Sequence, residues 1–274
     1  MSPDAILEFD RVSKHFGGLS VVENLSFTVR RESRTALIGP NGAGKTTVFN
    51  LISGVFPVDV GCIRVNGTDV THVPSRARVR HGVARTFQNV RLMPHLSTLE
   101  NVIVGQHSRG GGWRGVLHPI NLIPGNRWRE EARAALADAG LADYAKISVG
   151  NLPYGVQKRV EVVRALMAKP ALLLLDEPAA GLNPAETETL QLYLRKLSRD
   201  GGLTLLVVEH DMHFVDALCG EVVVLSFGKK IAEGSPDAIR RNPHVQEVYL
   251  GKPATAAAPV APDAMEYRRA AYSA

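Results

Sequence analysis

Gly39, Gly44, Lys45 and Thr46 complete the pattern G-x-x-x-x-G-K-[ST], which is typical of a loop that binds the phosphates of a nucleotide. The glycines allow several backbone N–H groups to point at one anion, and the lysine reaches the outer phosphates. The hydroxyl of Thr46 suits Mg²⁺, and the helix expected from Lys45 turns its positive N-terminal end on the same anion. A chance match on an ordinary turn is the alternative, and the apolar strand expected over 36–38 argues against it. We therefore predict a nucleotide site made by Gly39, Pro40, Asn41, Gly42, Ala43, Gly44, Lys45, Thr46 and Thr47.

Two adjacent carboxylates, Asp176 and Glu177, follow the apolar run 172–175. In a nucleotide site, Asp176 would hold Mg²⁺ through its water shell, and Glu177 would polarise the water that attacks the terminal phosphate. A plain surface turn after a strand is the alternative. Because a phosphate loop accompanies the pair, the catalytic interpretation is favoured.

Other polar residues stand where elements are expected to end or begin. Gln88 follows the apolar run 83–87, and His210 closely follows the run 203–208. Gly155 lies at the expected start of a helix. His210 and His213 are three residues apart, but with no third ligand in view we do not predict a metal pair.

These residues need a sheet that brings strand ends together. Alternation of apolar strands with helices predicts an α/β fold with right-handed crossovers. We expect strands over 6–9, 20–29, 36–38, 62–65, 69–70, 83–87, 171–175, 203–208 and 221–225. Helices are expected from Lys45 to Gly54 and over 75–81, 98–106, 128–139, 155–169, 184–197 and 212–218, with a hairpin through Gly228 and short helices up to Leu250.

Composition limits the class of protein. The 274 residues carry a net charge of +5 and are 45% hydrophobic, which suits a globular protein with an anionic ligand. The basic residues are spread along the chain, so no nucleic-acid partner is expected. Cys62 and Cys219 match no metal-ligand spacing and are expected to be isolated reduced thiols. We find neither a signal peptide nor an apolar run long enough to cross a bilayer, and we expect a soluble cytoplasmic chain.

The chain divides at two changes of character. Residues 4–250 are expected to form one ATPase domain, with a mostly helical subdomain inserted at about 89–168. Within that insertion, 107–127 is rich in Gly, Pro and Arg and is expected to be a loop with a flexible tip at 110–113. Residues 251–274 are rich in Ala and Pro and are expected to be a disordered tail.

Taken in order, these motifs resemble those of the ATP-binding cassette (ABC) ATPases over about residues 4–250. GPNGAGKTT resembles the Walker A motif, LLLLDEP the Walker B motif, Gln88 the Q-loop, and His210 the switch histidine. LPYGVQ, which begins at Leu152, resembles the signature motif, and Gly181, Leu182 and Asn183 resemble the D-loop.

The resemblance implies a fold and roles for residues. It implies a P-loop NTPase (recA-like) core with an antiparallel β-subdomain and a helical subdomain that carries the signature. It implies that ATP and Mg²⁺ are the cofactors, that Phe16 stacks on adenine, and that the metal is held by Thr46, Gln88 and Asp176. The implied catalytic residues are Glu177, His210 and Gln88. In this family two copies sandwich two ATP molecules, so the signature residues Leu152, Pro153, Tyr154 and Gly155 would act on the ATP of the partner.

One subgroup is especially similar. ARTFQNVRLMPHLSTLENVIVGQH, LPYG, PAAGLNP and AEGSPDAIRRNPHVQEVYLG resemble the ATP-binding subunits of branched-chain amino-acid importers. This likeness implies a second ATPase subunit, the same or paralogous, in a head-to-tail sandwich, and a transmembrane permease whose coupling helix meets Gln88 and the helical subdomain. It also implies a periplasmic or extracellular solute-binding protein, and a peripheral position on the cytoplasmic face of the inner membrane.

The chain departs from the family pattern in places. Pro153 and Tyr154 replace the serine and first glycine of the common signature, so the serine hydroxyl is missing there. Val156 stands where glutamine is usual, and Asn183 replaces a frequent aspartate. These departures leave the turnover rate open, while the backbone N–H groups near Gly155 remain suited to a phosphate.

Three alternatives remain open. The chain could be the similar subunit of a urea or short-chain amide importer, or of a lipopolysaccharide exporter. A soluble ABC ATPase acting on nucleic acid or ribosomes is less favoured, because such proteins usually carry two cassettes and coiled-coil insertions. A small-molecule phosphotransferase is weaker still, since no acceptor pocket is suggested.

Overall fold

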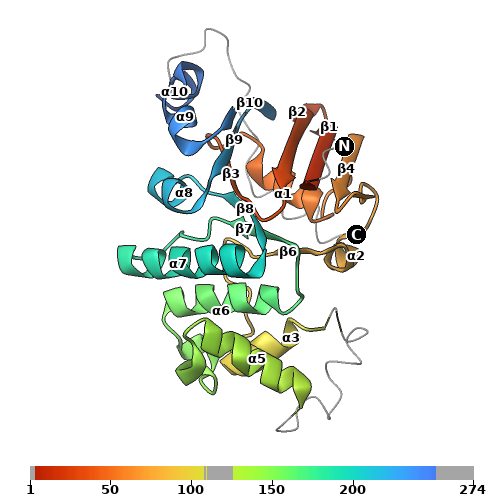
Figure 1. Ribbon diagram of the computed structural model, residues 1–274. Helices are drawn as coiled ribbons and strands as arrows, with labels where there is room; N and C mark the ends of the chain where they lie inside the picture. The colour runs from red at the N-terminus through yellow and green to blue at the C-terminus, as the bar shows by residue number, and fades with distance from the viewer. Residues whose placement is uncertain (1–3, 108, 110–125, 251–274) are drawn as a thin grey trace.

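The computed structural model describes residues 4–107, 109 and 126–250, and it contains two β-sheets (Figure 1). The larger has six strands in the order β10-β9-β3-β8-β7-β6, all parallel except that β10 runs antiparallel to β9. Its strands are β3 (Arg34–Ile38), β6 (Val83–Arg85), β7 (Leu172–Asp176), β8 (Thr204–Val208), β9 (Glu221–Ser226) and β10 (Lys229–Gly234). Every residue of β7 and β8 is buried, as expected for central strands covered on both faces.

The smaller sheet is antiparallel, in the order β2-β1-β4-β5. Its strands are β1 (Ala5–Phe16), β2 (Leu19–Arg30), β4 (Val60–Val65) and β5 (Thr68–Asp69). Helix α1 (Lys45–Ile52) buries Val48, Phe49, Leu51 and Ile52 in a core that includes residues of both sheets. The antiparallel β-subdomain is therefore joined to the parallel core through the helix that follows the phosphate loop.

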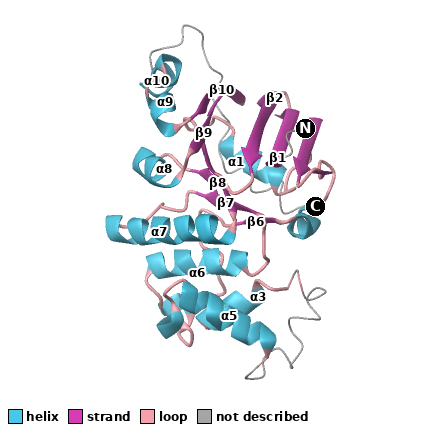
Figure 2. Cartoon of the chain, viewed as in Figure 1, coloured by secondary structure: helices cyan, strands magenta, loops and turns pink. Residues whose placement is uncertain are grey.

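The opposite face of the large sheet is covered by helices. Figure 2 shows α7 (Pro184–Gly201) next to the sheet, with α6 (Tyr154–Leu166), α5 (Arg127–Asp138) and α3 (Thr98–Val104) beyond it. Their apolar residues share one core cluster with the facing side of the large sheet. The remaining elements are α2 (Ser75–Arg78), α8 (Met212–Leu218), α9 (Pro236–Arg240), α10 (Pro243–Leu250) and the 3₁₀ turns Val79–His81, Ala142–Tyr144 and Val149–Asn151.

Local sequence signals fix the starts of α3 and α7. Ser97 and Glu100 form a capping box at the start of α3, and Asn183 and Glu186 form another at the start of α7. At the end of α7, Gly202 adopts a left-handed conformation with φ 64°. Helix α7 consequently runs four residues past the predicted boundary at Leu197, because nothing stops it before that glycine.

The α/β class and the antiparallel subdomain are confirmed, and several boundaries differ from prediction. Strand β1 continues well past Phe9 through bulged register shifts, which let a twisted strand keep pairing. Strand β6 ends at Arg85, two residues early, and α6 ends at Leu166. The predicted loop tip at 110–113 and the tail at 251–274 lie outside the described residues.

Cys62 and Cys219 are free thiols, as predicted, one half-buried and one buried. Burial raises the pKa of the Cys219 thiol to about 12. In the part of the chain that the structure describes, no helix combines the length and the apolar character needed to span a bilayer.

Candidate active site

The predicted site residues gather at the carboxyl edge of the parallel sheet, where ligands bind in open α/β sheets. The phosphate loop follows β3, and Gln88 follows β6. Asp176 ends β7 with Glu177 next in the chain, and His210 comes two residues after β8. Because β3, β8, β7 and β6 are adjacent in that order, the four segments emerge side by side.

The phosphate loop is packed so tightly that it admits no side chain at Gly39. That residue has φ 154°, and a Cβ there would lie 2.2 Å from the carbonyl oxygen of Leu225. Gly44 is the N-cap of α1 and makes no side-chain capping bond, so the first N–H groups of the helix remain available to an anion. This backbone conformation suits the phosphate cradle expected from the sequence, and phosphate binding there stays a prediction.

Lys45 reaches back over this cradle. Its Nζ donates to the carbonyl oxygen of Gly39 at 2.6 Å and to that of Pro40 at 3.0 Å. Burial lowers the pKa of Lys45, while the carboxylates of Glu177 and Asp176 oppose the shift. The ammonium is hydrogen-bonded to the loop and interacts electrostatically with both carboxylates. A lysine that binds phosphate is expected at such a position.

Asp176 forms a buried ion pair that sequence reasoning missed. Arg85 Nη2 lies 2.7 Å from Asp176 Oδ2, and each side chain is only 10% exposed. A second nitrogen of Arg85 donates to the amide oxygen of Asn50 at 2.6 Å. An arginine inside the apolar run 83–87 was the available signal, because a buried guanidinium requires an anionic partner.

Glu177 is brought together with Gln88 and His210. Gln88 Nε2 donates to Glu177 Oε2 at 2.6 Å, and His210 Nδ1 lies 3.8 Å from Glu177 Oε1. Glu177 has φ +45°, a strained conformation for a residue with a side chain, and its N–H donates to the carbonyl of Val208 at 2.9 Å. The strand next to β7 therefore holds the backbone of this glutamate at the sheet edge.

Glu209 is a second residue that sequence reasoning missed. It is 1% exposed, and its two carboxylate oxygens accept from Ala179 N at 2.9 Å and His210 N at 3.2 Å. Burial raises the pKa of Glu209. The side chain fastens the segment after Glu177 to the backbone of His210, and a charged residue closing an apolar strand was the signal.

The signature and D-loop residues lie beside one another within the chain. The ring of Tyr154 covers Gly181, where a Cβ would lie 3.0 Å from Tyr154 Cε1. A Cβ at Gly155 would lie 2.4 Å from Oε1 of Glu186, the residue that caps α7 together with Asn183. Among the described residues, no hydrogen bond or ion pair joins residues 152–155 to the phosphate loop of the same chain.

Phe16, the predicted adenine platform, ends β1. Its ring meets Phe56 edge-on at 5.0 Å between centroids, and Lys14 Nζ lies 5.2 Å from its centroid. The contacts with Phe56 and Lys14 fix the position of the Phe16 ring. Stacking of this ring on adenine stays a prediction.

The donor set fits a magnesium ion that arrives with phosphates. Within the described ranges, no three His, Cys, Asp or Glu side chains lie close enough together to hold a metal. Mg²⁺ in nucleotide sites takes one or two protein oxygens and completes its shell with water and phosphate. The Thr46 hydroxyl and the Asp176 carboxylate would be suited to supply those protein oxygens, and their role as metal ligands stays a prediction.

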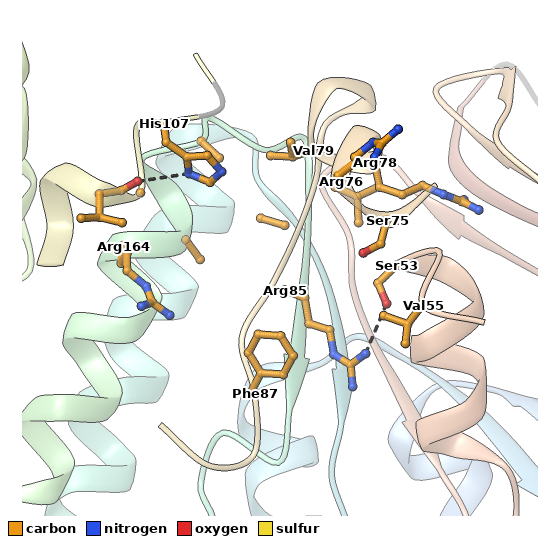
Figure 3. Close-up of a pocket in the computed structure, with 16 residues that line it drawn as sticks. Ser53, Val55, Ser75, Arg76, Arg78, Val79, Arg85, Phe87, His107 and Arg164 are labelled. Carbon is orange, nitrogen blue, oxygen red and sulfur yellow. Dashed lines mark hydrogen bonds between the residues drawn. The ribbon is translucent and has the colours of Figure 1, made fainter. Parts of the chain in front are cut away.

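A basic groove lies beside this site, between α1 and α2 on one side and α3 and α6 on the other (Figure 3). It encloses about 370 Å³, and the basic residues lining it are Arg76, Arg78, Arg85, His107 and Arg164. Arg78 is 2% exposed, and its Nη1 finds no hydrogen-bond partner in the described part of the chain. Burial lowers the pKa of Arg78 to about 10. Its Nε and Nη2 donate to the carbonyl oxygens of Val73 and Thr71, so this guanidinium is bonded within its own segment.

Comparison with known proteins places these features in a family. A family model described as ABC transporter matches residues 22–180, and one described as branched-chain amino acid ATP-binding cassette transporter matches residues 229–255. The chain is 40% identical over 253 residues to the high-affinity branched-chain amino acid transport ATP-binding protein BraF of Pseudomonas aeruginosa, with 90% of this chain and 98% of the relative covered. It is 38% identical to the corresponding Escherichia coli protein LivG, with the same coverage.

The fold has solved counterparts as well. An ATP-binding cassette of an ABC transporter in its ADP conformation superposes with a TM-score of 0.80 at 30% identity, covering 90% of this chain and 99% of that one. This likeness confirms the predicted cassette fold.

Proposed function

The chain belongs to the ABC transporter family, in the group of branched-chain amino acid transport ATP-binding proteins, and from this premise we propose that it powers the import of branched-chain amino acids by hydrolysing ATP. The observation that carries the proposal is the 2.6 Å hydrogen bond from Gln88 to Glu177. It lies at the same edge of the sheet as the phosphate loop. The match over residues 229–255 favours this solute class over urea, amides or lipopolysaccharide.

Each residue has a task in the proposed reaction. The backbone of residues 39–44 and the Nζ of Lys45 bind the phosphates. Thr46, Asp176 and Gln88 would hold Mg²⁺, which would supply charge neutralisation at the phosphates. Glu177 takes the proton of the attacking water, and His210 and Gln88 orient that carboxylate and water from either side. The Arg85 ion pair fixes Asp176 so that little reorganisation accompanies metal binding.

The signature completes the site of a second subunit. Of the signature residues, Pro153 and Tyr154 are exposed beside the exposed D-loop residues Gly181 and Asn183, while Leu152, Gly155 and Leu182 lie beneath them as buried or half-buried support. They make no hydrogen bond to the phosphate loop of the same chain within the described residues. A head-to-tail dimer, with the same chain or a paralogue, would supply the contact, and ATP would close it.

The basic groove is the proposed seat of the permease. An acidic segment of the permease would pair with the exposed Arg76 at the mouth of the groove and hold the chain at the cytoplasmic face of the membrane. A solute-binding protein on the other side would deliver the amino acid, so the solute itself never touches this chain.

Replacing Glu177 with glutamine tests the catalytic proposal. Glu177→Gln keeps the size and the contact with Gln88 but cannot accept a proton, so we expect ATP binding to persist while turnover falls at least about a hundredfold. The trapped dimer should appear in size-exclusion chromatography with ATP. Hydrolysis at the parent rate by the purified variant would remove Glu177 from the role of general base.

Reversing a charge at the mouth of the groove tests the permease proposal. Arg76 is exposed and lines the groove, so Arg76→Glu should weaken co-purification with the permease and lower leucine uptake into vesicles at least about tenfold. ATP hydrolysis by the isolated chain should not change. Arg80→Glu is the matched control, because Arg80 is exposed on the next turn outside the groove lining. Equal loss in both variants would contradict a docking role for the groove.

A further inference from the structure

Helix α6 presents three charged side chains, at spacings of three residues, to the loop that carries Gln88. Lys158, Glu161 and Arg164 lie on one face of the helix, as this spacing requires. Lys158 is 4% exposed and Glu161 is 2% exposed. Burying charges on that scale costs free energy unless each finds partners, and the partners here are informative.

All three residues bind backbone atoms of the loop. Lys158 Nζ donates to the carbonyl oxygen of Gln88 at 2.7 Å. Glu161 Oε1 accepts from Arg91 N at 3.1 Å, and Arg164 Nη1 donates to Arg91 O at 2.5 Å. The loop is thus attached to α6 at Gln88 and at Arg91. We expect this segment to move together with the helix.

Lys158 also reaches the two ends of the proposed machinery. Its Nζ lies 3.5 Å from the carbonyl oxygen of Glu177 and 5.7 Å from the ring centroid of Tyr154, at the start of the same helix. The first distance is a long hydrogen bond, and the second is within the range of a cation–π contact. One ammonium therefore touches the signature, the loop of Gln88 and the backbone of the proposed base.

We propose that Lys158 is a positioning residue: it ties Gln88 to helix α6, so that the position of the signature end sets the contact between Gln88 and Glu177. This inference rests on the proposed roles of Gln88 and Glu177. Because the signature acts on the nucleotide of the partner, Lys158 links the state of one site of the dimer to the geometry of the other. A lysine that merely filled the junction between helix and core would stabilise the fold without setting the rate.

The test is the variant Lys158→Met in the full-length chain. Methionine has a similar length and no charge. Because removing one buried charge from a cluster also costs unfolding free energy, kcat is measured at a temperature at which circular dichroism shows the variant to be folded. Loss of charge-assisted bonds should lower kcat at least about tenfold and leave the KM for ATP within about twofold, because Lys158 does not touch the phosphate loop. Hydrogen–deuterium exchange over residues 88–91 should become faster.

The matched control is Arg159→Met. Arg159 is the next residue on α6, but it donates to the carbonyl of Ala139 in the helical subdomain, at 3.4 Å. We expect this variant to keep the parent kcat and the parent exchange at residues 88–91. An equal loss of kcat in both variants would make the effect a general one of the helix and would overturn the role of Lys158.

Measuring Glu177→Gln in parallel separates the two proposals. If Glu177→Gln loses turnover while Lys158→Met keeps the parent kcat and exchange, only the positioning role is overturned. If Glu177→Gln hydrolyses ATP normally, the proposed base is wrong and the inference fails with it.

Discussion

The ion pair of Arg85 with Asp176 gives the carboxylate at the end of β7 a single orientation, since both side chains are buried. Asn50 holds the other side of the guanidinium, so helix α1 and strands β6 and β7 meet at this one group. In its proposed role as a metal ligand, a carboxylate fixed in this way would lose little conformational freedom on binding.

Replacing Arg85 with methionine should therefore destabilise the fold as well as the site. The variant leaves Asp176 buried without its partner, which costs about 3 kcal/mol of unfolding free energy. Urea denaturation measures this loss. Arg133→Met removes an ion pair to Glu130 whose side chains are about half exposed, and it should cost under about 1 kcal/mol. Similar urea midpoints for the two variants would contradict the large contribution to the free energy of unfolding that we assign to the Arg85 ion pair.

Residues that belong to a motif could be predicted from sequence, whereas Arg85, Glu209 and Lys158 could not. Glycines, a lysine and paired carboxylates report their chemistry through local spacing. The three missed residues act through partners far away in the chain, such as Asp176 for Arg85, and only the fold brings these together. A charge inside an apolar run signals that a partner exists, but not which one.

At the scale of elements, strands β7 and β8 were predictable from their almost continuous apolar runs, and the helix after the phosphate loop was predictable from the motif and from the apolar residues on its buried side. Boundaries were less so. Strand β6 ends at Arg85 because its edge position gives it only β7 as a neighbour, and α7 extends to the first residue that can leave the helix.

The phosphate loop yields a prediction at this scale. In Gly39→Ala, the new Cβ would fall 2.2 Å from the Leu225 carbonyl, so β9 or the loop must shift. We expect ATP affinity, measured with a fluorescent analogue, to drop at least about tenfold, together with a lower melting temperature. Gly42→Ala is the control, because Gly42 also has positive φ but no atom within 4 Å of its Cβ position. If Gly42→Ala were as harmful, backbone strain rather than packing would explain the loop.

At the scale of the whole molecule, the fold class and family could be inferred from the order of the motifs, while the second half of the ATP site could not be placed on this chain. The signature lies on the helical side of the large sheet. Among the described residues, it makes no hydrogen bond to the phosphate loop of its own chain. The proposed site is thus divided between subunits, and this division can be tested by mixing them.

Two inactive variants should restore each other. Lys45→Ala disables the phosphate loop, and Gly155→Asp places a carboxylate against Glu186 and toward the phosphate of the partner. Each alone should be inactive in an ATPase assay. A mixed dimer keeps one site in which both halves are intact, so an equimolar mixture should regain activity. A mixture as inactive as its components would contradict a site shared between two copies of this chain.

The positive φ of Glu177, +45°, has a consequence for how the sequence evolves under selection. A left-handed residue with a side chain carries about 1 kcal/mol or more of strain, and glycine would adopt the same conformation freely. Selection for durability alone would replace the glutamate, and only selection for turnover would keep it. In a duplicated copy of this gene that is no longer selected for transport, we expect early replacement of Glu177, for example by glycine. The encoded protein would gain stability and lose ATP hydrolysis.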